Sequence, residues 1–422
     1  MIENGMTLDR EAKVIRVHYP LIRDPALLSD NRRQVISMCK GLEARLKKQE
    51  HLAAYNKEMQ SFLDRGVIRE LTKEEMDVWR GPVNYVLHHG VPKPGSTTTP
   101  LRVVSNSSLN NNDSGHSYNS ILAKGPNALT LLLQVLVTFR SYTNVVVWDL
   151  HKAYNCMYTG DDEMHCRRFV WRWGYDNSEW RTYAFVRVHF GDRPAAVCME
   201  KSRLIAIEAG KDIDPELVER MNKGGYVNDN VNGGTEAEID KMVGEITEKD
   251  GEFFYSGTVA RVFDLIGMRP KVMVRSGEQD PRSLDKLGGS VPGYRWSAKE
   301  DEIVMKIVAN ISPKKYGVRL EDDLDSCNLE KLQNRTLTLR RVMGIVCSVY
   351  DPLGLISPIT LKLKILLKET HKIPKLKWDD ALPREMQLRW VEAIKDIVNM
   401  QEIRISRSEI STEYSVAEIR KF

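Results

Sequence analysis

Two aspartates in this chain stand at the ends of predicted strands, where carboxylates can bind divalent metal ions. Asp149 closes the apolar run Val145-Val146-Val147-Trp148, and Asp229 follows Gly225-Tyr226-Val227-Asn228 at a predicted tight turn. Carboxylates at the ends of neighbouring strands can hold two metal ions about 3.5–4 Å apart, which stabilise the attacking and leaving oxygens of phosphoryl transfer. Asn228 stands where this chemistry requires an acid.

The composition indicates a globular protein with two or three domains. The chain has 422 residues, of which 42% are hydrophobic and 28% charged, and its net charge is +4. Basic residues are concentrated between residues 335 and 377, where nine of them stand against the two acids Asp351 and Glu369. They are Arg335, Arg340, Arg341, Lys362, Lys364, Lys368, Lys372, Lys375 and Lys377. Such a run is commonly a solvated surface, and the sharper interpretation is a track for backbone phosphates.

The cysteines and the apolar segments bear on the compartment. The six cysteines are scattered without metal-ligand spacing, which favours reduced residues in a cytosolic or nuclear protein. No apolar run is long enough to span a membrane, and no signal segment follows Met1. We therefore expect cytoplasmic or nuclear localisation and no membrane partner.

The periodicity predicts a mixture of helices and strands, which is typical of an α/β or α+β fold. A long helix is expected over residues 31–64, capped by Ser29-Asp30, after an irregular or extended lead-in. Further strands are expected at residues 67–71, 84–88, 101–104, 167–171, 184–189 and 271–275, with a pair at 288–296 and 302–307. Further helices are expected at residues 125–140, 194–209, 215–222, 236–247 and 256–266, and throughout the chain after Thr338.

Several short motifs follow one another in a fixed order. They are Thr99-Pro100-Leu101-Arg102-Val103-Val104, Leu122-Ala123-Lys124-Gly125-Pro126-Asn127, Asp149-Leu150-His151-Lys152-Ala153-Tyr154, Arg168-Phe169-Val170-Trp171-Arg172, Phe190-Gly191-Asp192-Arg193-Pro194-Ala195, the Tyr226 turn, Tyr350-Asp351-Pro352-Leu353-Gly354 and Trp378-Asp379-Asp380. Together they resemble the reverse-transcriptase region of a BEL/Pao-type retrotransposon Pol polyprotein, with the Pao-family C-terminal region after it. The resemblance covers nearly the whole chain.

The resemblance implies an α+β right-hand polymerase with fingers, palm and thumb and a mostly helical C-terminal extension. The implied parts are a lead-in at 1–28, an N-terminal helix and fingers at 29–125, a palm with the metal site at 126–255, the end of the palm with a primer-grip hairpin at 256–334, and a truncated thumb- or connection-like helical region at 335–422. The implied partners are an RNA or DNA primer–template and deoxynucleoside triphosphates. A full element would also carry protease, ribonuclease H and integrase parts, which we expect to be absent from this chain.

The resemblance also implies roles for individual residues. Asp149 and Asp229 would bind Mg²⁺, or Mn²⁺ in its place, with Asn228 beside them at a normally acidic position. The nucleotide site would be formed by Arg102 and Lys93 at the triphosphate, Tyr154 against the sugar, and Phe190 and Gly191 beneath the templating base. The primer grip would contain Gly293, Tyr294 and Trp296.

The chain departs from the family pattern at three functional places. The family has Tyr-x-Asp-Asp where this chain has Tyr226-Val227-Asn228-Asp229, and an amide oxygen is a poorer magnesium ligand than a carboxylate. Ser105 and Asn106 replace an aromatic residue and an acid, and Pro292 interrupts the primer-grip strand, where proline removes a ladder hydrogen bond. These departures predict impaired or lost polymerase activity.

Each candidate residue also has an ordinary structural interpretation. Taken alone, Asp149 would cap a turn, Tyr154 would be a core aromatic residue, Arg102 a surface cation and Gly191 a turn residue. Three functions remain open: an RNA-directed DNA polymerase using two-metal nucleotidyl transfer, a catalytically dead nucleic-acid-binding remnant, and an interaction protein that uses only the scaffold. Asp113-Ser114-Gly115 spells an aspartic-protease triplet, but it lies in a polar stretch and is interpreted as a turn.

Overall fold

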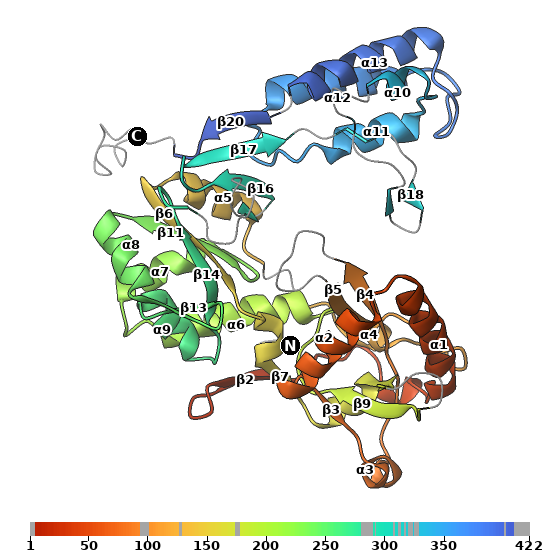
Figure 1. Ribbon diagram of the computed structural model, residues 1–422, viewed down its shortest axis with the longest axis vertical. Helices are drawn as coiled ribbons and strands as arrows, with labels where there is room; N and C mark the ends of the chain where they lie inside the picture. Colours follow the sequence, from red (N-terminus) through yellow and green to blue (C-terminus); the bar gives the residue numbers. More distant parts are fainter. Residues whose placement is uncertain are drawn as a thin grey trace. The chain divides into compact units, whose positions relative to one another are not determined.

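The fold is that of a computed structural model of the chain (Figure 1). It describes residues 5–92, 101–125, 129–173, 178–279, 290–291, 293–306, 309–310, 314–315, 318–319, 324, 329–400 and 402–408. Helices and strands are mixed, which confirms the α+β class. Among the described residues, no helix is long and apolar enough to cross a lipid bilayer.

The chain divides into two compact units. The first contains Met1–Leu131, Trp148–Asn230 and Glu236–Met273, and the second contains Leu132–Val147, Val231–Thr235 and Val274–Phe422. These two units do not test the five predicted segments, so the names fingers, palm and thumb stay predictions.

The first unit begins with a hairpin inside the predicted lead-in. Strands β1 (Met6–Asp9) and β2 (Val14–Val17) pair antiparallel, and β2 pairs parallel with β7 (Met157–Thr159). Alternate residues of β2 are buried, namely Ile15 and Val17, so the strand contributes to the core. A short 3₁₀ helix, η2 (Pro25–Leu27), follows.

The single helix predicted over residues 31–64 is two helices. They are α1 (Arg32–Lys48) and α2 (Leu52–Asp64), and Asn31 rather than Ser29 or Asp30 is the N-cap of the first. Between them Glu50 has φ +56°, a left-handed conformation that a continuous helix does not contain. The residues at the break, Lys47 to His51, include no proline or glycine that would mark a helix end in the sequence.

Two small sheets pack against these helices. One has the order β3-β9-β8, formed by β3 (Ile68–Glu70), β9 (Arg181–Phe185) and β8 (Arg168–Trp171), and the other is the hairpin β4 (Leu87–Pro92) with β5 (Leu101–Asn106). Helix α1 contacts β8 and β4, and α2 contacts β5 and β3. The short helices of this part are α3 (Lys73–Val78), α4 (Tyr118–Ile121), η3 (Ala153–Cys156) and η4 (Asp162–Arg167).

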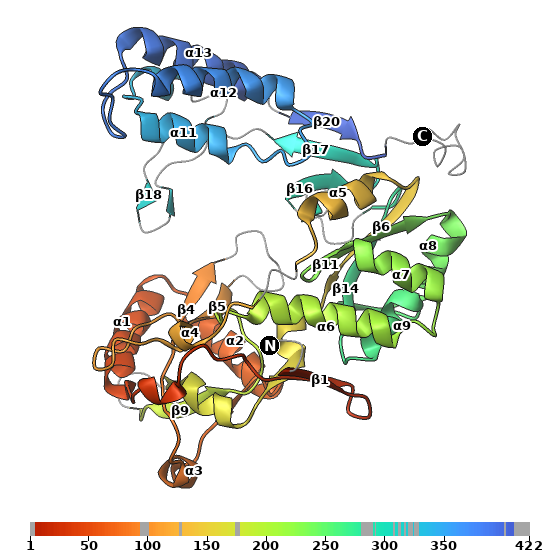
Figure 2. The same cartoon turned by 180° about the vertical axis from the view of Figure 1, so that it is seen from behind.

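A helical group completes the first unit. Helix α6 (Ala195–Ala209) contacts α7 (Pro215–Lys223) and α9 (Thr258–Asp264), and α9 also contacts α8 (Glu236–Val243) (Figures 1 and 2). The hairpin β12 (Ile246–Lys249) with β13 (Glu252–Tyr255) lies between α8 and α9 in the sequence. Helix α8 ends four residues before the predicted end because Gly244, at φ +66°, follows it.

The sheet that carries the candidate site has four strands in the order β10-β11-β6-β14. Its strands are β10 (Gly225–Tyr226), β11 (Asp229–Gly234), β6 (Asn144–Leu150) and β14 (Pro270–Arg275). The boundary between the two units falls within β6, β11 and β14. The residues of the candidate site that lie on these strands, from Trp148 onward and up to Asn230, belong to the first unit.

The second unit contains a four-stranded sheet, a short hairpin and a group of helices. The sheet has the order β15-β16-β17-β20, formed by β15 (Ser290–Val291), β16 (Tyr294–Ser297), β17 (Glu302–Lys306) and β20 (Glu402–Ser406). Helix α12 (Ser357–His371) contacts both α11 (Leu339–Ser348) and α13 (Arg384–Asn399) (Figure 1). The other elements are α5 (Leu132–Arg140), α10 (Glu330–Gln333), β18 (Lys314–Lys315) and β19 (Val318–Arg319).

Candidate active site at the β10–β11 turn

Strand β6 delivers Asp149 to the edge of the site. The preceding residues Val145, Val146, Val147 and Trp148 are all buried, as expected for a strand covered on both faces. Asp149 is partly exposed. The apolar run therefore fixes the strand in the sheet and leaves the carboxylate accessible.

The hairpin β10–β11 delivers the second part of the site. Tyr226 pairs with Asp229, so Val227 and Asn228 form a two-residue turn. Such turns need positive φ angles, for which glycine and asparagine are preferred. Val227 nevertheless has φ +61°, which is strained for a β-branched residue. The backbone N–H of Leu150 donates to the carbonyl of Asn228 over 3.3 Å, which ties the turn to the end of β6.

Asn228 and Asp149 contact each other directly. The Asn228 Nδ2 donates to Asp149 Oδ1 over 2.6 Å. An ionised carboxylate only accepts hydrogen bonds, so the amide must present its NH₂ group to Asp149 and turn its own oxygen elsewhere. The Asn228 amide thus occupies one acceptor site of the Asp149 carboxylate. It does not place a second oxygen ligand beside that carboxylate.

Whether the site can hold a metal ion depends on the oxygen, nitrogen and sulfur ligands that its side chains supply. Among the described residues, no group of three or more histidine, cysteine, aspartate or glutamate side chains is placed to hold a metal ion. Asp149 and Asp229 supply two carboxylates, and one Mg²⁺ is commonly held by one or two carboxylates together with substrate phosphates. The described side chains therefore do not by themselves form a metal site, and the binding of an ion by Asp149 and Asp229 stays a prediction.

Three predicted nucleotide-site residues lie together in the first unit. The rings of Tyr154 and Phe190 are 4.8 Å apart, and the guanidinium of Arg102 lies 5.0 Å from the centre of the Phe190 ring. Burial, together with the negative charge of Asp229, raises the pKa of Tyr154 to about 12. Arg102, Tyr154 and Phe190 are therefore neighbours, whereas Lys93 falls outside the described residues.

Position 191 requires glycine because its backbone packs closely against Ser105. Its φ is +114°, and a Cβ added there would lie 2.1 Å from the backbone oxygen of Ser105. Ser105 in turn donates to the carbonyl of Phe190 from both its backbone N–H, at 3.1 Å, and its hydroxyl, at 2.8 Å. Ser105, one of the departures from the family pattern, thus holds the loop that carries Phe190.

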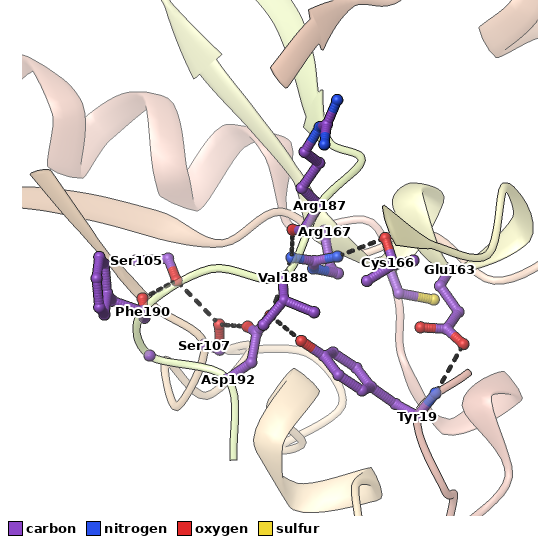
Figure 3. Close-up of polar contacts among 12 residues, drawn as sticks. Tyr19, Ser105, Ser107, Glu163, Cys166, Arg167, Arg187, Val188, Phe190 and Asp192 are labelled. Carbon is purple, nitrogen blue, oxygen red and sulfur yellow. Dashed lines mark hydrogen bonds and ion pairs between the residues drawn. The ribbon is translucent and has the colours of Figure 1, made fainter. Parts of the chain in front are cut away.

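A buried ion pair that the sequence analysis did not identify holds the same loop (Figure 3). Arg167 Nη2 lies 2.9 Å from Asp192 Oδ2, and both side chains are almost fully buried. The hydroxyls of Ser107 and Tyr19 donate to Asp192 over 2.7 and 3.1 Å. Burial alone would lower the pKa of the Arg167 guanidinium, but the Asp192 carboxylate raises it above its ordinary value. The one available signal was the position of Asp192 within the Phe190-to-Ala195 motif.

The predicted primer-grip residues belong to the second unit, and two of their side chains are buried. Trp296 is fully buried, donates to Asp301 over 3.0 Å, and packs edge-on against Phe139. The hydroxyl of Tyr294 donates to Asp351 over 3.2 Å. A grip at these residues would have to use their backbone, because both side chains serve the core. Gly293 is exposed, and Pro292 lies outside the described residues.

Comparison with known proteins relates the C-terminal part of the chain to retrotransposons. The family described as "Pao retrotransposon-like RNaseH-like domain" matches residues 338–422. This part of the chain is therefore similar to a retrotransposon family whose description names a ribonuclease H-like domain, and the absence of the other polyprotein parts stays a prediction. No curated protein sequence matches the chain.

One solved structure with a detectable likeness is the "foamy viral protease-reverse transcriptase dRH in complex with ds DNA". The two are 13% identical, with a TM-score of 0.42. The match covers 80% of this chain and 46% of the viral chain, so this chain spans less than half of that protein.

The η4 residue Glu163 generates a prediction about pH. Its Oε1 accepts from the Tyr19 backbone N–H over 2.9 Å and lies 3.7 Å from His18, while its buried Oε2 has no hydrogen-bond partner among the residues that the structure describes. Burial raises the pKa of Glu163 to about 7, against the lowering effects of the Tyr19 N–H and the Arg167 charge. The folded state therefore holds a proton that the unfolded state releases near pH 4.5, so stability falls as pH rises from about 4.5 to 7.

Glu163→Gln should remove this loss, because glutamine keeps the acceptor for Tyr19 without ionising. We expect urea unfolding at pH 5 and pH 7.5 to show the variant losing less stability than the wild type, by on the order of 2 kcal/mol. The exposed residue Asp161 provides the control, since it is not among the charges that shift the pKa of Glu163 and Asp161→Asn should keep the wild-type pH dependence. Identical pH profiles for wild type and Glu163→Gln would contradict the assignment.

Proposed function

We propose that this chain is the reverse-transcriptase region of a Pao-type retrotransposon Pol polyprotein, and that Asn228 impairs its nucleotidyl transfer. The observation that carries the proposal is the placement of Asn228 and Asp149 in contact at a turn between strands. The retroelement match at residues 338–422 supports the same origin. In this proposal the fingers and palm keep their predicted bounds of 29–125 and 126–255, and the region after Thr338 contacts nucleic acid.

Each residue of the site has one role in the proposal. Arg102 binds the triphosphate, because guanidinium forms charge-assisted hydrogen bonds with phosphate oxygens. Tyr154 lies against the nucleotide sugar, where its ring excludes a 2′-hydroxyl, and Phe190 lies beneath the templating base. Asp149 and Asp229 hold Mg²⁺, which supplies charge stabilisation for the developing phosphoryl transition state.

The chemical consequence of Asn228 follows from its hydrogen bond. A carboxylate at position 228 would face Asp149 with a second negative charge, and a cation between the two would relieve their repulsion. An amide at this position satisfies Asp149 without a cation and brings no charge of its own. The residue therefore stabilises the metal-free site and weakens the metal-bound one.

Primer extension tests the proposal. We expect the unaltered chain to give little or no extension of a primed homopolymer template with Mg²⁺, because the site has lost one charged ligand. Asn228→Asp should raise the extension rate at least about tenfold, and Asp149→Ala in that background should abolish the gain. Asn112→Asp makes the same charge change at an exposed position away from the turn and should leave extension unchanged.

Two outcomes of this experiment would reject parts of the proposal. Robust extension by the unaltered chain would show that Asn228 does not impair transfer. If neither Asn228→Asp nor Asn228→Asp with Pro292→Leu extends a primer to which it binds, the catalytically dead nucleic-acid-binding remnant becomes the function. If the folded chain does not bind primer–template at all, the interaction protein that uses only the scaffold remains.

Helix α12 generates a separate prediction about nucleic-acid binding. Lys364, Lys368 and Lys372 are exposed and spaced four residues apart, so they share one face at the helix and its C-cap. Lys362 is the contrasting case on this helix, since it forms an ion pair with Asp396. The three aligned lysines are the best placed to follow a phosphate backbone.

Affinity for primer–template should fall steeply with salt, because bound lysines release counterions from phosphates. Replacing Lys364, Lys368 and Lys372 with alanine should reduce the slope of log affinity against log salt by roughly 0.9 for each phosphate that is no longer neutralised. Lys362→Ala should leave the slope nearly unchanged. A slope that the triple replacement does not alter would exclude this face of α12 from binding.

A further inference from the structure

Helix α6 carries two charged residues at buried positions, where apolar residues are usual. Glu200 and Arg203 are fully buried and form an ion pair across one helical turn, with Arg203 Nη2 2.6 Å from Glu200 Oε1. Two buried charges cost more in desolvation than their attraction returns unless their remaining hydrogen-bonding capacity is used. The partners of this pair therefore show what it holds.

The second oxygen of Glu200 reaches the turn of the candidate site. Glu200 Oε2 accepts from the backbone N–H of Val227 over 3.2 Å. Arg203 donates to the carbonyls of Met221 and Asn222, at 3.0 and 3.3 Å, where α7 leads into β10. The Glu200–Arg203 pair thus contacts both the end of α7, just before the hairpin, and the turn of the hairpin.

Thr130 completes the network. Its hydroxyl donates to Glu200 Oε1 over 3.1 Å and accepts from Arg203 Nη2 over 3.3 Å. This hydroxyl bridges the two charged side chains, so their orientation is set by groups outside the helix. A rotation of Glu200 would break bonds at both oxygens.

Two features of the β10–β11 hairpin show how this network fits the turn. Val227 is held in the left-handed region at φ +61°, where a β-branched residue is strained. Gly225 leaves the space that Arg203 fills, since a Cβ there would lie 2.4 Å from Arg203 Nε. The residue that follows Val227 is Asn228, which contacts Asp149.

We propose that Glu200, supported by Arg203, is a positioning residue that holds Val227 in its strained conformation and thereby places residue 228 against Asp149. The geometric part of this proposal stands on the hydrogen bonds alone. Its consequence for nucleotidyl transfer rests on the proposed function.

The test is hydrogen exchange of the Val227 amide in the full chain, followed by NMR or in the peptide covering residues 224–231. Two variants differ only in the acceptor at position 200: Glu200→Leu with Arg203→Met, and Glu200→Gln with Arg203→Met. Both remove the buried cation, so neither leaves an unpaired charge. We expect the Val227 amide to exchange roughly tenfold faster in the leucine variant than in the glutamine variant, which keeps an oxygen for the bond.

A matched pair elsewhere controls for the loss of a buried ion pair as such. Glu43 on α1 forms a nearly buried pair with Arg172 over 2.6 Å. Glu43→Leu with Arg172→Met should leave exchange at Val227 unchanged, because neither residue contacts the turn. Equal exchange at Val227 in the leucine and glutamine variants would overturn the proposal. If both unfold, Thr130→Val is the milder change; it should still accelerate exchange several-fold, and unchanged exchange would then overturn the proposal.

Catalysis supplies the second readout. In the Asn228→Asp background, the leucine variant should lower kcat for primer extension at least about tenfold relative to the glutamine variant, with unchanged affinity for primer–template. An equal kcat in the two variants would overturn the link to transfer. If no variant extends a primer, the proposed function fails, whereas the exchange result still decides whether Glu200 holds the turn.

Discussion

The alignment of the β10–β11 turn with the end of β6 is the constraint on which the candidate site depends. The Leu150 N–H donates to the Asn228 carbonyl, so residue 228 must lie across from the end of β6. From that position the Asn228 side chain meets Asp149, and Asp229 follows as the first residue of β11. The other contacts of the site support this alignment. Glu200 and Arg203 hold the turn from α6, and Ser105, Arg167 and Asp192 hold the neighbouring Phe190 loop.

This arrangement explains why one amide can change the chemistry of the site. An acid at position 228 would make a cation necessary, because two facing carboxylates repel each other in a partly buried place. The amide makes the cation unnecessary, because its NH₂ group satisfies the existing carboxylate. In the proposed function, the amide thus replaces a metal ligand with a hydrogen bond to Asp149 that needs no cation. A chain of this kind can retain nucleic-acid binding after losing transfer, since phosphate contacts and metal ligands are different residues.

The local signals of the fold were readable from the sequence, and the long-range ones were not. The apolar run before Asp149 predicted β6, and Pro215 at the start of α7 agreed with its helical pattern. The break between α1 and α2 was missed because no proline or glycine stands between Leu46 and Leu52 to mark a helix end. The pairs Glu200–Arg203 and Arg167–Asp192 were missed for a different reason: a buried charge looks like a surface charge until its partners are known. For the site, Asp149, Asn228 and Asp229 could be named in advance, but the direction of the Asn228 amide depends on the folded contact.

Metal affinity tests the central claim most directly. The claim is that Asn228 stands where a metal-binding carboxylate is expected and that its amide occupies the carboxylate of Asp149. Titration of Mn²⁺ into the nucleotide-free chain, followed by the loss of its free electron-paramagnetic-resonance signal, measures this affinity. Mn²⁺ prefers the same oxygen ligands as Mg²⁺. Asn228→Asp should bind Mn²⁺ at least about tenfold more tightly than the unaltered chain, and Asp149→Ala should remove the gain. Equal affinities in the unaltered chain and in Asn228→Asp would contradict the claim, because residue 228 would then take no part in holding a metal.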